Sequence, residues 1–265
     1  MSGTTDCTRL PLEVQRAYVL AALREDMIVN ERDGSPMVLV PAGELEMGDG
    51  EGRTCPKHRV FLDAYYIGIS CVTNCQYKIF VDATGNRPPD ESDRSGDPVW
   101  QGKMYPEAYA DHPVVCVSWE DAKAYASWAG CRLPSEAQWE KAARGTEGYR
   151  YPWGNEWDES KCRNDKNRGI KTTCAVWGYP EGVSGYGTYN QGGNVWEWCS
   201  DWYDGNYYNT SPQDNPEGPE AGSVRVFRGG NWRFDGPSLF RCAIRNGDDP
   251  GKRLDFRGFR LVRAV

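Results

Sequence analysis

The chain has 265 residues, of which 39% are hydrophobic and 26% are charged, and its formal net charge is -7. This negative balance argues against a nucleic-acid binder, because affinity for a phosphate backbone depends on a basic face. The 11 Trp, 15 Tyr, 30 Gly and 17 Pro residues indicate a compact, loop-rich protein, since disordered chains are poor in aromatic residues. No apolar run is long enough to span a bilayer.

Three elements are predicted before residue 70. Apolar residues spaced along residues 10–29 predict a helix. An apolar run over residues 37–43 predicts a strand that is ended by turn residues, and residues 60–67 predict a second strand. We find no internal repeat and no clean linker, so we expect a lead-in over residues 1–36 and a single domain over residues 37–265.

Three further helices have recognisable start signals. Thr73 is a suitable N-cap for a helix that continues through Asp82. Ser118 precedes Asp121 by three residues, and Ser135 precedes Gln138 by three residues, which is the capping-box spacing. The three helices are expected to end near Gly85, Gly130 and Gly145.

Two long segments lack a helix or strand period. Residues 86–113 are rich in Pro, Asp and Gly and predict an irregular loop. From residue 146 onward the chain consists mainly of turn residues, aromatic residues and short strand-like runs. We therefore expect the packing of Trp and Tyr side chains, together with backbone hydrogen bonds, to hold that half together.

The ten cysteines allow two interpretations. An even number is compatible with a disulfide framework in an oxidising compartment. The chain opens without a basic and apolar leader, which indicates either a cytosolic protein or one whose leader has been removed. We expect mostly buried free thiols, which behave as small hydrophobic side chains, with a full disulfide set as the alternative.

Five short motifs occur in a fixed order and together resemble a known superfamily. They are MVLVPAGE at 37–44, HPVV at 112–115 leading to VSWEDA at 117–122, RLPSEAQWE at 132–140, GNVWEW at 193–198, and RGG at 228–230 with GFR at 258–260. In this order they resemble the formylglycine-generating-enzyme-like superfamily. The resemblance implies an α+β, loop-rich, C-type-lectin-like fold of the formylglycine-generating-enzyme subtype over about residues 37–265.

The resemblance does not extend to the catalytic residues of the family enzyme. That enzyme converts a substrate cysteine to formylglycine with copper and oxygen, using two cysteines shortly after the Gly-Gly turn, where thiolates ligate a soft metal. Residues 231–241 contain no cysteine, and the motif places Cys242 at a structural position. The related sulfoxide synthases of ergothioneine type need a histidine iron triad, whereas this chain has only His58 and His112. We therefore expect no catalytic residue and no required cofactor.

The segment from Arg228 to Val262 also resembles the variable region of proteins diversified by retroelements, the group that includes the Treponema variable protein. In such regions template adenines are replaced at random, and a randomised AAC codon cannot encode Lys, Glu, Gln, Met or Trp. All the positions that we expect to vary and to bind ligand belong to the permitted set. They are Arg233, Phe234, Asp235, Leu239, Ile244, Asn246, Gly247, Asp248, Asp249, Leu254, Asp255 and Phe256.

The resemblance implies a non-enzymatic, receptor-like or adhesin-like protein whose diversified segment at about 228–262 binds protein or glycan ligands that vary. The residues that we expect to cluster on one exposed face are Arg233, Phe234, Asp235, Asn246, Asp248, Leu254, Asp255 and Phe256. Core packing is the alternative for Phe234, Leu239, Ile244, Leu254 and Phe256. The other candidate functions are a copper oxidoreductase of the formylglycine-generating type, a catalytically inactive relative, and an accessory domain that binds a sugar or peptide. We expect a monomer without a transmembrane segment. The resemblance favours the cell surface or the extracellular space, and the absence of a leader leaves a cytoplasmic location open.

The resemblance also implies a calcium loop. Asn190, Gly193, Val195 and Glu197 match the family's calcium positions, where two side-chain oxygens and two carbonyls suit a hard cation. The alternative is a loop held by its own hydrogen bonds. Trp196 and Trp232 follow glycine-rich turns, so we expect both to be buried anchors.

Overall fold

The computed structural model describes residues 16, 24–52, 55–93, 98–169 and 172–265. The helix expected over residues 10–29 falls mainly outside these residues. Its last three positions form a strand instead, β1 (Met27–Val29). Because β1 pairs with β2 (Pro36–Val40), the domain begins before residue 37, where the sequence had placed its start.

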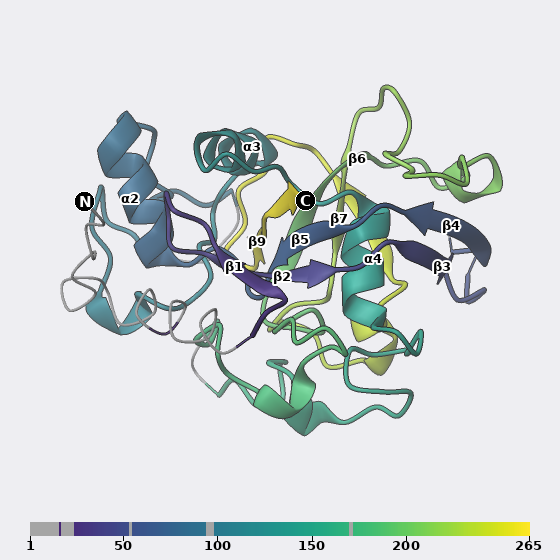
Figure 1. The fold of residues 1–265 in the computed structure, drawn as a ribbon. Helices are drawn as coiled ribbons and strands as arrows, with labels where there is room; N and C mark the ends of the chain where they lie inside the picture. Colours follow the sequence, from purple (N-terminus) through teal and green to yellow (C-terminus); the bar gives the residue numbers. More distant parts are fainter. Residues whose placement is uncertain (1–15, 17–23, 53–54, 94–97, 170–171) are drawn as a thin grey trace.

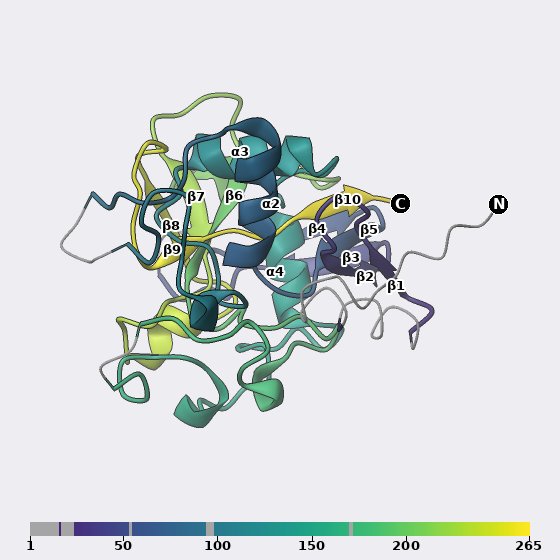
Figure 2. The same cartoon turned by 90° about the vertical axis from the view of Figure 1, so that its left-hand side faces the viewer.

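The first sheet brings the two ends of the domain together. Its strand order is β1-β2-β5-β10, with β5 at Tyr65–Gly68 and β10 at Val262–Ala264. All three pairings are antiparallel. The C-terminal strand β10 lies beside β5 (Figure 2), so residues 262–264 close a sheet whose other strands all precede residue 70.

Each of the two predicted strands in the first 70 residues is divided in the structure. The run over residues 37–43 ends as β2 at Val40, and Gly43 opens β3 (Gly43–Met47). The run over residues 60–67 is interrupted at residues 63 and 64, which separates β4 (His58–Leu62) from β5. The strands β3 and β4 form a separate two-stranded antiparallel sheet. Because the chain turns within each apolar run, each run contributes strands to two different sheets.

The three capped helices are confirmed. They are α2 (Asn74–Thr84), α3 (Trp119–Trp128) and α4 (Glu136–Arg144), and each begins with a complete capping box. Gly85 ends α2 in the left-handed conformation, with φ of 72°. Residues 86–113 form an irregular segment that includes only a short 3-10 turn at Glu107–Tyr109 among its described residues.

The second sheet lies in the C-terminal half, where regular structure is sparse. Its order is β8-β7-β6-β9, with β6 at Trp196–Trp202, β7 at Arg225–Arg228, β8 at Arg245–Asp248 and β9 at Arg257–Gly258. The β6–β9 pairing is parallel, whereas β7 pairs antiparallel with both β6 and β8. Helix α4 packs against β3 and β4 on one side and β6 and β7 on the other, so it bridges the hairpin and this sheet (Figure 1). The loops contain short 3-10 turns at Glu159–Lys161, Pro180–Gly182, Tyr207–Asn209 and Pro237–Phe240.

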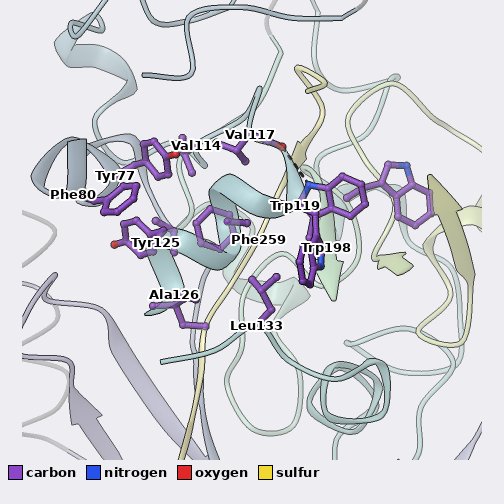
Figure 3. Packing of buried hydrophobic residues seen from close by; sticks show 14 of the residues in the cluster. Tyr77, Phe80, Val114, Val117, Trp119, Tyr125, Ala126, Leu133, Trp198 and Phe259 are labelled. Atoms are coloured by element: carbon purple, nitrogen blue, oxygen red, sulfur yellow. Dashed lines mark hydrogen bonds between the residues drawn. The ribbon is translucent and has the colours of Figure 1, made fainter. Parts of the chain in front are cut away.

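Aromatic side chains dominate the main core. Tyr77 of α2 stacks on Tyr125 of α3, with ring centroids 5.5 Å apart, and Phe259 packs edge-on against both rings. Figure 3 shows these rings beside Trp119 and Trp198. The indole of Trp198 donates to the Val117 carbonyl at 3.2 Å, and that of Trp119 donates to the Cys199 carbonyl at 2.7 Å. The buried polar edges of these indoles are therefore paired, as burial requires.

The nine cysteines within the described residues are free thiols, and seven of them are buried. This agrees with the expectation of small buried hydrophobic side chains for those nine. In the part of the chain that the structure describes, no helix has the length and apolar character needed to cross a membrane.

Trp196 and Trp232 are 2% and 4% exposed, so the expectation that both are buried anchors is confirmed. We predict that Trp196→Ala lowers the free energy of unfolding by about 3–5 kcal/mol, because it leaves a cavity in the core. Asn246→Ala, at an exposed position on β8, should change it by about 0.5 kcal/mol or less. Chemical denaturation of both variants measures the difference. Similar losses in the two variants would contradict the distinction between scaffold and surface.

Candidate functional site

A glycine turn after β7 positions the candidate binding loop. Gly229 and Gly230 have φ of 104° and 75°, a backbone conformation that favours glycine. A Cβ atom at Gly230 would lie 2.9 Å from the Leu239 carbonyl oxygen, so a side chain there would collide with the returning end of the loop. The turn therefore needs glycine for both its conformation and its space.

Trp232 anchors the loop to two distant segments. Its backbone N–H donates to the Asn194 carbonyl at 3.0 Å, and its indole N–H donates to the Asp255 carbonyl at 3.3 Å. The loop backbone is thus held between the GNVWEW segment and residues 254–256. Side chains that follow Trp232 are presented from a rigid support rather than from a free loop.

Arg233 is held by an ion pair and by two aromatic rings. Its Nη2 donates to Asp255 Oδ2 at 2.6 Å, and its guanidinium lies over the rings of Trp232 and Phe256, at 4.7 and 5.0 Å from their centroids. Charge pairing and cation–π contacts act together here. Arg233 is therefore positioned by the residues that the sequence had grouped with it.

The rest of the loop is more open. Phe234 is 38% exposed and its ring meets Trp196 edge-on at 6.4 Å. Asp235 is exposed. Leu239 is half-buried against the cluster that includes Tyr151 and Phe240. Phe234 and Asp235 are thus exposed as expected, whereas Arg233 and Leu239 are half-buried, and we call these four residues the loop surface.

Leu254, Asp255 and Phe256 do not belong to an exposed face, so that part of the expectation is wrong. They are 2%, 5% and 7% exposed. The Leu254 carbonyl accepts from the Cys116 N–H at 3.0 Å, and the Phe256 carbonyl accepts from the Trp196 N–H at 2.9 Å. Because the main chain is joined to the core on both sides, these side chains support the loop surface from beneath.

The remaining candidates lie on or beside the edge strand β8. Asn246 and Asp249 are exposed, whereas Asp248 is half-buried and accepts from Arg257 Nη2 at 2.9 Å. Gly247 cannot vary freely, because an added Cβ would lie 2.7 Å from the Tyr203 ring. Ile244 packs against the main core. Gly247 is therefore a correction to the predicted set, and Ile244 follows the core alternative.

The predicted calcium loop fits a cation at one position and not at another. Asn190 is buried, and within the described residues nothing donates a hydrogen bond to its Oδ1, which is the orphaned oxygen that a cation would use. Glu197 is already neutralised, because its two carboxylate oxygens accept from Arg260 Nε and Nη2 at 2.6 and 2.7 Å. Trp139 donates to the same carboxylate at 2.8 Å. Calcium binding stays a prediction, with Asn190 as its side-chain ligand and Gly193 and Val195 as the carbonyl donors that the resemblance implies.

Cys242 is a buried thiol rather than an accessible nucleophile. It is fully buried, and burial raises the pKa of its thiol, which disfavours the reactive thiolate. Among the described residues, no group of three His, Cys, Asp or Glu side chains is arranged to hold a metal ion.

Sequence reasoning missed the partners of Glu197. Arg260 lies 63 residues further along the chain, and Trp139 lies on α4. Both belong to motifs that were recognised, RLPSEAQWE and GFR, but motif order does not reveal which side chains meet. The usable signal was the single charged residue in each of GNVWEW and GFR, Glu197 and Arg260, because buried charges are usually paired.

We predict that Arg260→Met lowers the free energy of unfolding by about 3–5 kcal/mol, because it leaves the Glu197 carboxylate buried without its cation. The double variant Glu197→Met/Arg260→Met should recover part of this loss, since no buried charge is left unpaired. Urea denaturation of the two single variants and the double variant measures the coupling. A double variant that loses the sum of the two single losses would show that the pair contributes no coupling.

For the calcium loop, we predict that metal-free protein melts at a higher temperature after calcium is added and that magnesium has little effect. The ion binds only the folded loop, and saturation at about 100 times the dissociation constant adds about 2.7 kcal/mol. Magnesium requires a smaller and stricter octahedral site. Asn190→Gly keeps the left-handed backbone, with φ of 59°, and removes the oxygen, so it should abolish the calcium response. A calcium response that survives in Asn190→Gly would place the ion elsewhere.

Comparison with known proteins agrees with this geometry. Residues 24–265 match the family model described as the sulfatase-modifying factor enzyme 1-like domain. The formylglycine-generating enzyme of Streptomyces coelicolor is 36% identical, over 91% of this chain and 93% of that protein. A protein of Chlamydia trachomatis named serine/threonine-protein kinase Pkn1 is 39% identical over 86% of this chain, which spans only 38% of that protein's length.

Two solved structures share the fold. PvdO from Pseudomonas aeruginosa superposes with a TM-score of 0.77 at 28% identity, over 90% of this chain and 98% of that one. Treponema denticola variable protein 1 superposes with a TM-score of 0.72 at 24% identity, with the same coverage. The likeness to the variable protein concerns the fold alone. From the family match over residues 24–265 and the shared architecture, the chain belongs to the formylglycine-generating-enzyme-like family with the α+β C-type-lectin-like fold.

Proposed function

We propose that this chain is a non-enzymatic ligand-binding member of its family and that it binds a protein or glycan at the loop surface. One observation carries the proposal. The stretch that follows the Gly229–Gly230 turn contains no thiol over residues 231–241 and presents an exposed phenylalanine between two charged side chains. A cell-surface or extracellular location, which the resemblance favours, is part of this proposal.

The chemistry of the stretch argues against copper catalysis. A soft metal such as Cu(I) selects thiolate ligands, and the nearest thiol, Cys242, is buried with a raised pKa. A single buried thiol supplies neither an accessible nucleophile nor a pair of ligands.

The same stretch has the features of a binding surface. Phe234 is one of three large hydrophobic side chains that are exposed within the described residues. It lies between half-buried Arg233 and exposed Asp235, an arrangement of apolar anchor and polar rim that is typical of protein interfaces. The backbone beneath is held by Trp232, so side chains can change here at little cost to stability.

Diversification by a retroelement is the finer part of the proposal. The positions that tolerate replacement are those outside the core and the tight glycine site. They are Arg233, Phe234, Asp235, Leu239, Asn246, Asp248 and Asp249. A diversifying template should therefore carry adenine-rich codons at these positions and leave Gly247 and residues 254–256 unchanged.

A copper oxidoreductase is the second candidate, favoured by the relatives that bear the name formylglycine-generating enzyme. The two candidates differ in one measurable product. The enzyme converts a peptide cysteine to formylglycine, whereas the binding protein leaves the peptide unchanged.

We predict that copper-loaded protein, incubated in air with a cysteine-containing peptide, yields no formylglycine above the protein-free control. Mass spectrometry of the peptide measures the product. Turnover that disappears in a Cys242→Ser variant would overturn the proposal and establish the enzyme.

The binding arm of the same test uses a random peptide library and a glycan array. Ligands that the protein selects should lose at least about tenfold in affinity for Phe234→Ala/Asp235→Ala, while the melting temperature stays close to that of the original chain, because both side chains are exposed. Glu44→Ala, at an exposed position on β3, is the matched control and should bind normally. Equal binding by the double variant would remove the loop surface from the proposal.

A further inference from the structure

A cavity that is separate from the loop surface lies near Trp202, the last residue of β6. It is a cavity of about 560 Å³ lined by Trp119 and Lys123 of α3, Ser200 and Trp202 of β6, Arg225 of β7, and residues 217–220. This volume is in the range of small-molecule sites. The cavity shares no residue with the loop surface, and roughly 20 Å of extended strand separates Trp196 from Trp202.

Arg225 is held in this cavity between two tryptophans. The centre of its guanidinium lies 3.7 Å from the centroid of Trp119 and 3.4 Å from that of Trp202. Nη1 donates to the Ser200 carbonyl at 2.6 Å. Stacking on both faces leaves the edge of the guanidinium as the direction in which further hydrogen bonds can form.

The Arg225 guanidinium lacks a carboxylate partner. Within the described residues, no Asp or Glu oxygen lies within salt-bridge distance of it, and its Nε is buried without a hydrogen-bond partner. By contrast, Arg228, Arg245 and Arg260 are each paired with a buried glutamate. Four arginines belong to the strands of this sheet, and among the described residues Arg225 is the one without an ion pair, since Arg228, Arg245 and Arg257 are each paired.

The charges around the cavity are mixed. Lys123 places its ammonium 5.0 Å from the Trp119 centroid. The two acidic residues that line the cavity are Glu217, which pairs with Arg132 at 3.6 Å, and the exposed Glu220. Glu120 and Asp201 also lie close enough to interact electrostatically with Arg225, so the cavity offers one fixed guanidinium rather than an excess of positive charge.

We propose that this cavity binds a small organic carboxylate with a flat apolar part. The carboxylate accepts a charge-assisted hydrogen bond from Nη2 of Arg225, because Nη1 donates to Ser200 and Nε is buried. The flat part lies against the half-buried indole of Trp202. The two tryptophans hold Arg225 in its binding orientation before the ligand arrives, which reduces the entropy lost on binding.

Isothermal titration calorimetry of the full chain tests this with three probes. They are indole-3-acetate, its neutral analogue indole-3-acetamide, and inorganic phosphate. Indole-3-acetate should bind at least about tenfold more tightly than the amide, because only the carboxylate carries the charge that Arg225 recognises. It should also bind more tightly than phosphate, which lacks the flat apolar part. Equal binding of acid and amide, tighter binding of phosphate, or no binding of the acid up to its solubility limit would overturn the proposal.

Variants separate the role of the guanidinium from folding. Arg225→Gln should weaken indole-3-acetate binding at least about tenfold, and Arg225→Lys should weaken it less, because the charge is kept and the planar fork is lost. Arg168→Gln is the matched control, since Arg168 is also a half-buried arginine that lies over a tryptophan ring, 5.2 Å from the Trp232 centroid, and it should leave this binding unchanged. If Arg225→Gln fails to fold, Lys123→Gln replaces it and should weaken binding severalfold. A folded Arg225→Gln or Lys123→Gln variant that binds indole-3-acetate as tightly as the original chain would contradict the site.

Discussion

The ion pair between Glu197 and Arg260 joins four parts of the molecule at one buried point. Glu197 belongs to β6 and accepts a hydrogen bond from Trp139 of α4. Arg260 donates to the carbonyl of Gly68 on β5 at 3.0 Å and to the carbonyl of Tyr189, in the loop that precedes β6, at 2.8 Å. Both charged residues are fully buried, so their desolvation is offset only while every donor and acceptor is paired. Much of the loop-rich half is positioned by this requirement.

A second buried network does the same for α4 and β7. Arg228 pairs with Glu136 at 3.2 Å and also with Glu140, and Arg245 pairs with Glu136 at 2.7 Å. Arg228 also donates to the carbonyls of Ala243 and Cys242. Since Arg228 directly precedes the Gly229–Gly230 turn, this network sets where the candidate binding loop begins. A short helix and four short strands thus provide a rigid base without extensive regular structure.

The two candidate sites use opposite ends of the same strand. At the Trp196 end, Arg233 is neutralised by Asp255, and an apolar side chain, Phe234, is left exposed. At the Trp202 end, Arg225 is stacked but not neutralised, and a cavity adjoins it. The first arrangement suits a broad contact with a macromolecule, because it offers an exposed apolar anchor. The second suits a small anion, because it offers a fixed charge beside a cavity.

Local sequence was sufficient for the helices. Thr73, Ser118 and Ser135 each cap a helix whose third residue completes the capping box, and all of these contacts lie within four residues. Motif order was likewise sufficient for the fold family, because glycine turns and tryptophan anchors recur at recognisable positions. The sequence did not predict that the runs at 37–43 and 60–67 are each divided between two sheets. An apolar run does not indicate the position at which the chain turns.

Tertiary packing alone decided which of the candidate residues are exposed. Phe234 and Phe256 have the same chemistry and a similar irregular context, yet one is 38% and the other 7% exposed. The carbonyls of both residues accept a backbone hydrogen bond, so the difference lies in the side chains: Phe256 packs within the main core cluster and Phe234 does not. Glu197 looked like a free ligand in its loop and was found paired with a residue 63 positions away. Contacts between distant segments depend on how sheets and loops assemble, and a single sequence contains no local period that reports them.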